Sequence, residues 1–233
     1  IGYTVNKKRY QKRPDKNDIE ILNKISSYDF PYWVPQDKII SGDEINRASR
    51  DGIKYFEQYY TKRSLAIFSK IKSLISAPIY NTLITKIAFQ STIMYRYCTK
   101  GGGPMSGTMY VPALIKELNI FNQIEAFVKD RAKIALSDED GNVTTSTQSS
   151  TILSIRDNSI DYIFTDPPFG KNLMYSELNY LSEMWLKVKT NNKEECIECK
   201  TQSKLIVDYQ KIIERVFNEY YRVLKPQKWM SIE

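Results

Sequence analysis

One stretch, residues 160–170 (IDYIFTDPPFG), constrains the fold of this chain more than any other. Residues 162–165 are apolar, aromatic and β-branched, which predicts a short buried strand. Two prolines follow Asp166, and because proline has no N–H to donate to a ladder, the strand must end there. Each proline also favours an extended backbone in the residue before it. We therefore expect a stiff loop at the carboxyl end of a strand, where open α/β sheets bind ligands.

The residue types in this loop suit the recognition of an amino group. The Asp166 carboxylate and the Pro167 carbonyl are two acceptors on a stiff backbone, and a planar amino group offers two N–H donors. Phe169 can stack on the ring that carries the amino group. Such a site binds an exocyclic base amine and leaves its lone pair free to attack an electrophile. The alternative is a strand and a Pro-Pro turn in which Asp166 caps a neighbouring element.

The sequence of residues 165–170 (TDPPFG) resembles the catalytic motif of S-adenosylmethionine-dependent amino methyltransferases. Members of that family methylate adenine N6 or cytosine N4 in DNA, and a related group methylates guanine N2 in RNA. The acid-first form is similar to the adenine-N6 branch. Residues 172–180 (NLMYSELNY) and 221–232 (YRVLKPQKWMSI) also resemble bacterial DNA methylases of restriction systems, although Gln227 stands where the family usually has glycine.

The resemblance covers residues 150–233 and implies an α/β fold, part of a Rossmann-like methyltransferase sheet with a mainly helical insert or second domain. It implies S-adenosylmethionine as the cofactor, and catalysis by Asp166, Pro167, Pro168 and Phe169. Thr165 and Asp166 would contact the cofactor. Phe169, Asn172 and Tyr175 would contact a base flipped out of the duplex.

The expected reaction is transfer of a methyl group to N6 of adenine in DNA, with a restriction endonuclease as a candidate partner. Alternatives within the enzymes are N4-cytosine methylation of DNA and N2-guanine methylation of RNA. The alternative from another class is a non-catalytic nucleic-acid-binding subunit that keeps the fold. Product analysis separates the first three, and substitution of Asp166 separates the last.

Composition favours a nucleic-acid partner. The net charge is +7 and the pI is about 9.1, which suits a polyanion. No apolar run reaches the roughly 18 residues of a membrane span, and three cysteines without framework spacing predict a reducing, cytoplasmic location. The CxxC at 196–199 has one further cysteine and no histidine to complete a zinc site, so we expect no metal.

Basic residues supply further candidates for substrate binding. Residues 1–16 form either a phosphate-contacting arm or a solvated segment, with Lys7, Lys8 and Arg9 as the candidates. The glycine-rich stretch at 101–103 follows a predicted helix rather than a strand, which disfavours a cofactor loop. With Lys100 beside it, this stretch is a DNA-facing loop or a plain connector.

The domain prediction divides the chain into three parts. Residues 1–140 are a mainly helical insert and a candidate target-recognition region, 141–150 are a polar linker loop, and 151–233 carry the catalytic motif. No glycine-rich strand–helix turn for the cofactor is visible. We expect that turn to precede Ile1, so that the chain is a piece of a longer protein with half of its cofactor site elsewhere.

Several local elements are also predicted. Asp18 is expected to begin a short helix, and Thr61 to cap a longer one. The sequence also predicts helices at 79–98, 113–136, 175–188 and 209–224, and strands at 151–154 and 229–232.

Overall fold

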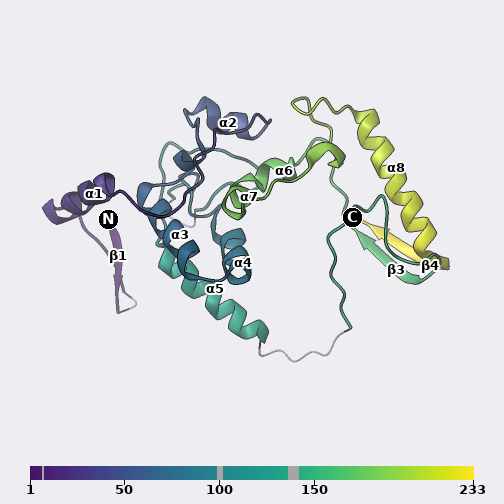
Figure 1. The fold of residues 1–233 in the computed structure, drawn as a ribbon, viewed down its shortest axis with the longest axis horizontal. Helices are drawn as coiled ribbons and strands as arrows, with labels where there is room; N and C mark the ends of the chain where they lie inside the picture. Colours follow the sequence, from purple (N-terminus) through teal and green to yellow (C-terminus); the bar gives the residue numbers. More distant parts are fainter. Residues whose placement is uncertain (7, 99–101, 136–141) are drawn as a thin grey trace.

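A computed structural model describes residues 1–6, 8–98, 102–135 and 142–233 of the chain. The structure is mixed α/β and mostly helical, with two small two-stranded sheets. Figure 1 shows one helical body in the middle, a part with β3, β4 and α8 on one side, and β1 and α1 on the other. The α/β class is confirmed at this level, whereas no Rossmann-like sheet is evident within the described ranges.

The N-terminal residues form a hairpin that the sequence did not predict. Strand β1 (Gly2–Val5) pairs antiparallel with β2 (Lys8–Gln11), and the rings of Tyr3 and Tyr10 stack with centroids 5.5 Å apart. The strands are short, and Tyr3, Val5 and Tyr10 are 43%, 49% and 44% exposed, so the hairpin buries little apolar surface.

Helix α1 (Lys16–Ser27) buries no residue and begins at Asp15. The prediction that Asp18 caps this helix is wrong. The Asp15 side chain accepts the N–H of Asp18 at 3.0 Å, and the Asp18 side chain accepts the N–H of Asp15 at 2.9 Å. This reciprocal capping box needs its first acid three residues before the second, which makes Asp15 the N-cap.

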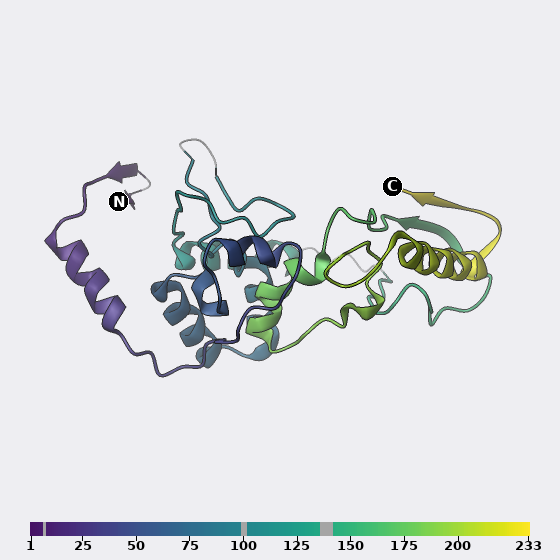
Figure 2. The same cartoon turned by 90° about the horizontal axis from the view of Figure 1, so that it is seen from above.

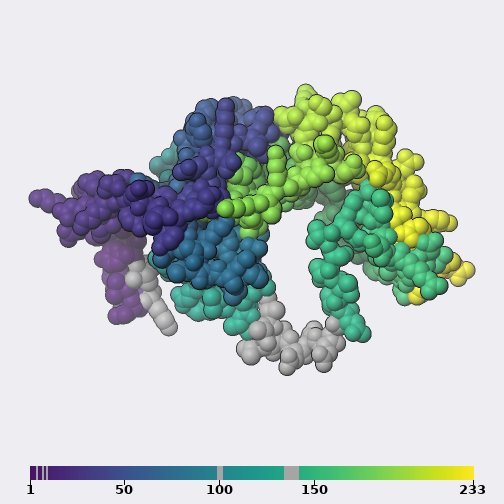
Figure 3. Space-filling view, in the orientation of Figure 1, coloured from purple at the N-terminus to yellow at the C-terminus, as the bar shows by residue number. Residues whose placement is uncertain are grey.

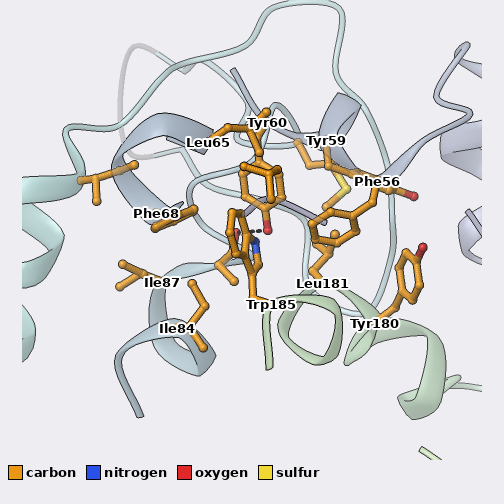
Figure 4. Packing of buried hydrophobic residues seen from close by; sticks show 14 of the residues in the cluster. Phe56, Tyr59, Tyr60, Leu65, Phe68, Ile84, Ile87, Tyr180, Leu181 and Trp185 are labelled. Atoms are coloured by element: carbon orange, nitrogen blue, oxygen red, sulfur yellow. Dashed lines mark hydrogen bonds between the residues drawn. The ribbon is translucent and has the colours of Figure 1, made fainter. Parts of the chain in front are cut away.

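The helical body is built around an aromatic core. Its elements are α2 (Ile45–Arg50), η1 (Phe56–Tyr59), α3 (Lys62–Leu74), α4 (Ala77–Ile87), α5 (Ile120–Ala135) and α7 (Tyr180–Leu186). Trp185 is fully buried, and the ring centroids of Phe68, Tyr60 and Phe56 lie 5.3, 5.9 and 6.1 Å from its own (Figure 4). The predicted cap of α3 is confirmed, because the Thr61 side chain accepts the N–H of Ser64.

Two predicted helices are shorter than expected. The helix predicted at 79–98 ends at Ile87, and the one predicted at 113–136 begins only at Ile120. Residues 88–94 form turns and a bend, and farther along Tyr97 N–H donates to the Leu114 carbonyl at 2.9 Å. This non-local pairing takes backbone groups that a helix would need.

A parallel strand pair forms the other part of the molecule. Strand β3 (Ile160–Thr165) pairs with β4 (Leu224–Ile232), and helix α8 (Ile206–Val223) leads directly into β4. These elements confirm the predicted strands at 162–165 and 229–232 and the predicted helix at 209–224. The strand predicted at 151–154 is wrong, because this segment forms a turn and Leu153 N–H donates to a side chain, that of Glu219.

The expectation that β3 is buried is also wrong. Tyr162 and Phe164 on one face of β3 are 54% and 64% exposed, and Trp229 beside them on β4 is 79% exposed. The opposite face is half-buried: there the Thr165 hydroxyl lies 3.3 Å from the Tyr220 hydroxyl of α8. The apolar character of the strand is real, but only one of its faces is covered.

The chain crosses between the two parts through residues 170–205. The single helix predicted at 175–188 is divided at Asn179 into α6 (Tyr175–Leu178) and α7, and a short turn η2 (Asn192–Glu194) follows. Figure 3 shows this green segment reaching from the helical body toward α8. Among the described residues, no helix combines the length and apolar character that crossing a membrane requires.

Candidate functional site

The DPPF loop, residues 166–169, lies where both strands of the parallel pair end. Thr165 is paired with Ile232, and the N–H of Glu233 donates to the Thr165 carbonyl at 3.0 Å. The loop therefore leaves β3 at the carboxyl edge of the pair. This is the placement predicted from the sequence.

Hydrogen bonds hold three successive backbone carbonyls at the end of the loop, those of Pro168, Phe169 and Gly170. The Pro168 carbonyl accepts the Tyr209 hydroxyl of α8 at 2.8 Å and the Gly170 N–H at 3.1 Å. The Phe169 carbonyl accepts the N–H of Asn172 at 3.1 Å, and the Gly170 carbonyl accepts the N–H of Glu198 at 3.0 Å. Gly170 has a φ of +55°, in the left-handed region that favours glycine.

The groups expected to bind a ligand are left free. Among the described residues, no hydrogen bond or ion pair uses the Asp166 carboxylate, and none uses the Pro167 carbonyl. Asp166 is exposed, and Phe169 is 61% exposed beside it. The loop thus combines an anchored backbone with unused acceptors and an exposed aromatic ring.

The other predicted site residues fall into two groups. Asn172 and Tyr175 are exposed and follow the DPPF loop directly, at the entry to α6. Thr165 is half-buried, and its hydroxyl faces Tyr220. These three residues lie near Asp166 because they are close to it in the sequence, and no hydrogen bond among the described residues joins them to it.

The basic candidates lie elsewhere. Lys8 is exposed on β2, and the N-terminal hairpin and the β3–β4 pair lie at opposite ends of the molecule in both views (Figures 1 and 2). The backbone of Arg9 is in β2, but its side chain lies outside the described part of the structure, as do Lys7 and Lys100 altogether. The structure does not bring the basic arm to the loop.

The sequence prediction missed Glu177, whose side chain joins α6 to the start of α2. Glu177 is 3% exposed, and its carboxylate accepts the backbone N–H groups of Asp43, Glu44 and Ile45 at 2.9, 2.7 and 3.1 Å. These donors open α2, so Glu177 caps that helix from a distant segment. Burial raises the pKa of the Glu177 carboxyl group, and the three N–H donors oppose this rise.

A second acid, Glu195, holds the start of α6. Its carboxylate accepts the N–H of Ser176 at 2.8 Å and the Ser176 hydroxyl at 2.6 Å, and Gln202 donates to it at 3.1 Å. The sequence gives no signal for the Glu177 contacts, because their donors lie more than 130 positions earlier in the chain.

The CxxC cysteines are both free thiols that bond to other groups. The thiol of Cys196 lies 3.8 Å from the Tyr209 carbonyl, and that of Cys199 lies 3.1 Å from the Thr201 hydroxyl. Within the described ranges, no cluster of three or more His, Cys, Asp or Glu side chains has the geometry to hold a metal ion.

Comparison of the chain with protein-family models, with curated proteins and with solved structures found no match.

Proposed function

We propose that this chain carries the target-base site of an amino methyltransferase that modifies adenine N6 in DNA. The observation that carries the proposal is the DPPF loop at the carboxyl edge of a parallel strand pair. Its Asp166 carboxylate and Pro167 carbonyl have no partner among the described residues, and Phe169 is exposed next to them. These are the groups that the resemblance assigns to the target amine.

The chemistry of an exocyclic amine fits these groups. Adenine N6 carries two N–H donors, which Asp166 and the Pro167 carbonyl can accept. When both N–H groups donate hydrogen bonds to these oxygens, the electron density on the nitrogen increases and its lone pair is oriented toward the methyl donor. Positioning of this kind can supply a large part of a rate enhancement, because it converts an encounter between molecules into a reaction within one complex.

Phe169 supplies the second contact with the base. The amine cannot be reached for in-line attack while the base is stacked in a duplex, so the base must be flipped out. An exposed aromatic ring beside the acceptors offers a stacking surface for the flipped base, worth about 1–3 kcal/mol. The Tyr209 bond to Pro168 keeps the backbone of this loop fixed while the base enters.

The proposal includes a larger sheet around β3 and β4, in the manner of a Rossmann-like fold. Parallel strands are almost always covered on both faces, yet Tyr162, Phe164 and Trp229 leave one face of this pair exposed. A further feature supports the resemblance. Gln227, at the position where the family usually has glycine, has a φ of +62°, which glycine adopts without strain.

Residues 142–233 do not by themselves fit S-adenosylmethionine. A cofactor loop needs glycines where the backbone approaches the ligand, and Gly170 is the only glycine in residues 142–233. The Thr165 hydroxyl faces Tyr220 instead of an open site. The proposal therefore assigns the residues of this chain to the target base and derives no step through the methyl donor.

The test is the substitution Asp166→Ala in the protein, with Asp161→Ala as the matched control. Asp161 lies on β3, the strand that leads into the DPPF loop, and it forms ion pairs with Lys225 and Lys228 at 2.8 and 3.4 Å. Transfer of labelled methyl groups to duplex DNA is measured, and the products are digested to nucleosides. We expect Asp166→Ala to abolish N6-methyladenine while DNA affinity changes less than about twofold, and Asp161→Ala to retain activity.

Retained turnover in Asp166→Ala would refute the proposal. A product other than N6-methyladenine would move the assignment to cytosine N4 in DNA or guanine N2 in RNA. An unmodified protein that binds DNA but transfers no methyl group would favour the non-catalytic subunit.

A further inference from the structure

Two lysine ammonium groups converge on one tryptophan ring of the helical body. The Nζ of Lys72, on α3, lies 4.0 Å from the centroid of the Trp33 ring, and the Nζ of Lys187, at the end of α7, lies 4.2 Å from it. Lys72 also donates to the Trp185 carbonyl at 2.7 Å. A third cation stands nearby in sequence: Lys70 donates to the Tyr32 hydroxyl at 2.6 Å. We call Lys70, Lys72 and Lys187 the lysine cluster.

The lysine cluster has no acidic partner in the part of the chain that the structure describes. None of its members takes part in an ion pair there. The groups that face Lys72 are Lys187, the Trp185 carbonyl and the Tyr80 ring, whose centroid is 5.4 Å away. Burial, together with the charge of Lys187, lowers the pKa of Lys72 to about 8, and burial raises the pKa of Tyr80.

Two like charges held at one ring without a counter-ion favour the binding of an anion. Cation–π contacts fix both ammonium groups in place, which reduces the entropy lost when a ligand binds. A phosphate group is the anion that suits several ammonium donors at once. Because both ammonium groups lie within 4.2 Å of the Trp33 ring centroid, where a stacked base would have to compete with them, the site suits a backbone phosphate.

We propose that the lysine cluster binds a backbone phosphate of the nucleic acid, so that the helical body holds the DNA while the DPPF loop holds the base. The nature of the polymer rests on the function proposed above, whereas the anion site rests on the lysine geometry alone.

The experiment measures the affinity of the protein for a duplex oligonucleotide at several salt concentrations. The test variant is Lys72→Gln/Lys187→Gln. The control is Lys86→Gln/Lys129→Gln, which removes the same charge from lysines already paired with Asp130 and Glu125. We expect about tenfold weaker binding at low salt and a salt slope smaller by about 1 in the test variant, since one phosphate contact contributes about 0.9. The control should change affinity less than about twofold.

A pH series separates a charge contact from a structural role. Affinity of the unmodified protein should fall several-fold between pH 7.5 and 9, because Lys72 with a pKa of about 8 loses the charge that the phosphate needs. Lys72→Arg should bind tightly with no such fall, since arginine stays charged. Lys187→Gln alone guards against misfolding, because among the described residues the Lys187 side chain donates no hydrogen bond.

Three results would overturn the proposal: a test variant that behaves like the control, a pH effect that persists in Lys72→Arg, or lysine-dependent binding of inorganic phosphate but not of the oligonucleotide. Methyl transfer and DNA binding, both measured in Asp166→Ala, separate the two proposals. If that variant still transfers methyl groups while the lysine dependence of binding holds, the proposed function fails and the phosphate site stands.

Discussion

Removal of the Glu177 carboxylate tests how α6 is held against the start of α2. Glu177→Ala removes the acceptor of three backbone N–H groups that open α2, and those groups lie in a part-buried junction that side chains fill. A hydrogen bond to a charged group is worth about 1.5–3 kcal/mol, and desolvation of the carboxylate offsets part of that sum. We expect the free energy of unfolding to fall by about 3 kcal/mol.

Gly42 offers an independent way to disturb the same contact. A Cβ placed on Gly42 would overlap the Glu177 carboxyl group, and its three nearest atoms all belong to that group. Gly42 does not have a positive φ, so alanine is not strained there for backbone reasons. Gly42→Ala should therefore lower stability by about 2 kcal/mol, by displacing the carboxylate from its donors.

The two changes form a double-mutant cycle measured by urea unfolding. In the Glu177→Ala background, Gly42→Ala should be neutral or stabilising by about 0.5 kcal/mol, since only the reduced entropy of the unfolded chain remains. The coupling energy should be about 2 kcal/mol. An equal loss from Gly42→Ala in both backgrounds would refute the reasoning, because the loss would then not pass through Glu177.

Three further changes test single features. Tyr209→Phe removes the hydroxyl that holds the Pro168 carbonyl, so methyl transfer should fall several-fold while DNA affinity is unchanged; an unchanged rate would show that this bond does not hold the loop. Gln227→Gly relieves a φ of +62° and should raise the unfolding free energy by about 0.5–1 kcal/mol, whereas a loss would contradict the strain. Hydrogen bonds from Arg222 and from the Leu153 N–H lower the pKa of Glu219 to about 2, below its unfolded value. The stability from Glu219 should therefore be present above about pH 4.5 and lost as pH falls toward 2, and Glu219→Gln should flatten the acid limb of the unfolding curve in that window.

Local sequence patterns predicted the elements that depend on local contacts. Thr61 begins α3 because its side chain reaches an N–H three residues ahead, and the Pro-Pro pair ends β3 because proline lacks a donor. The DPPF loop was placed correctly at a strand end for the same reason. These features depend on residues within one or two turns of each other.

The sequence could not predict features that depend on distant partners. The stretch around Arg96, which was predicted to be helical, instead pairs with Ile115. The burial of Glu177 depends on residues 43–45, which lie more than 130 positions earlier in the chain. Exposure of Tyr162 depends on what covers the sheet, and no pattern within β3 reports that.

Residues 170–187 link the DPPF loop to the helical body. At the start of this segment, the Gly170 carbonyl accepts the N–H of Glu198, which lies beyond α7, and the middle of the segment is tied to α2 through Glu177. Its end places Trp185 in the aromatic core and Lys187 at the lysine cluster. A shift of α6 and α7 would therefore move the lysine cluster relative to Asp166. For that reason Glu177→Ala should lower methyl transfer by more than its loss of folded protein explains, although Glu177 contacts neither the base nor the phosphate.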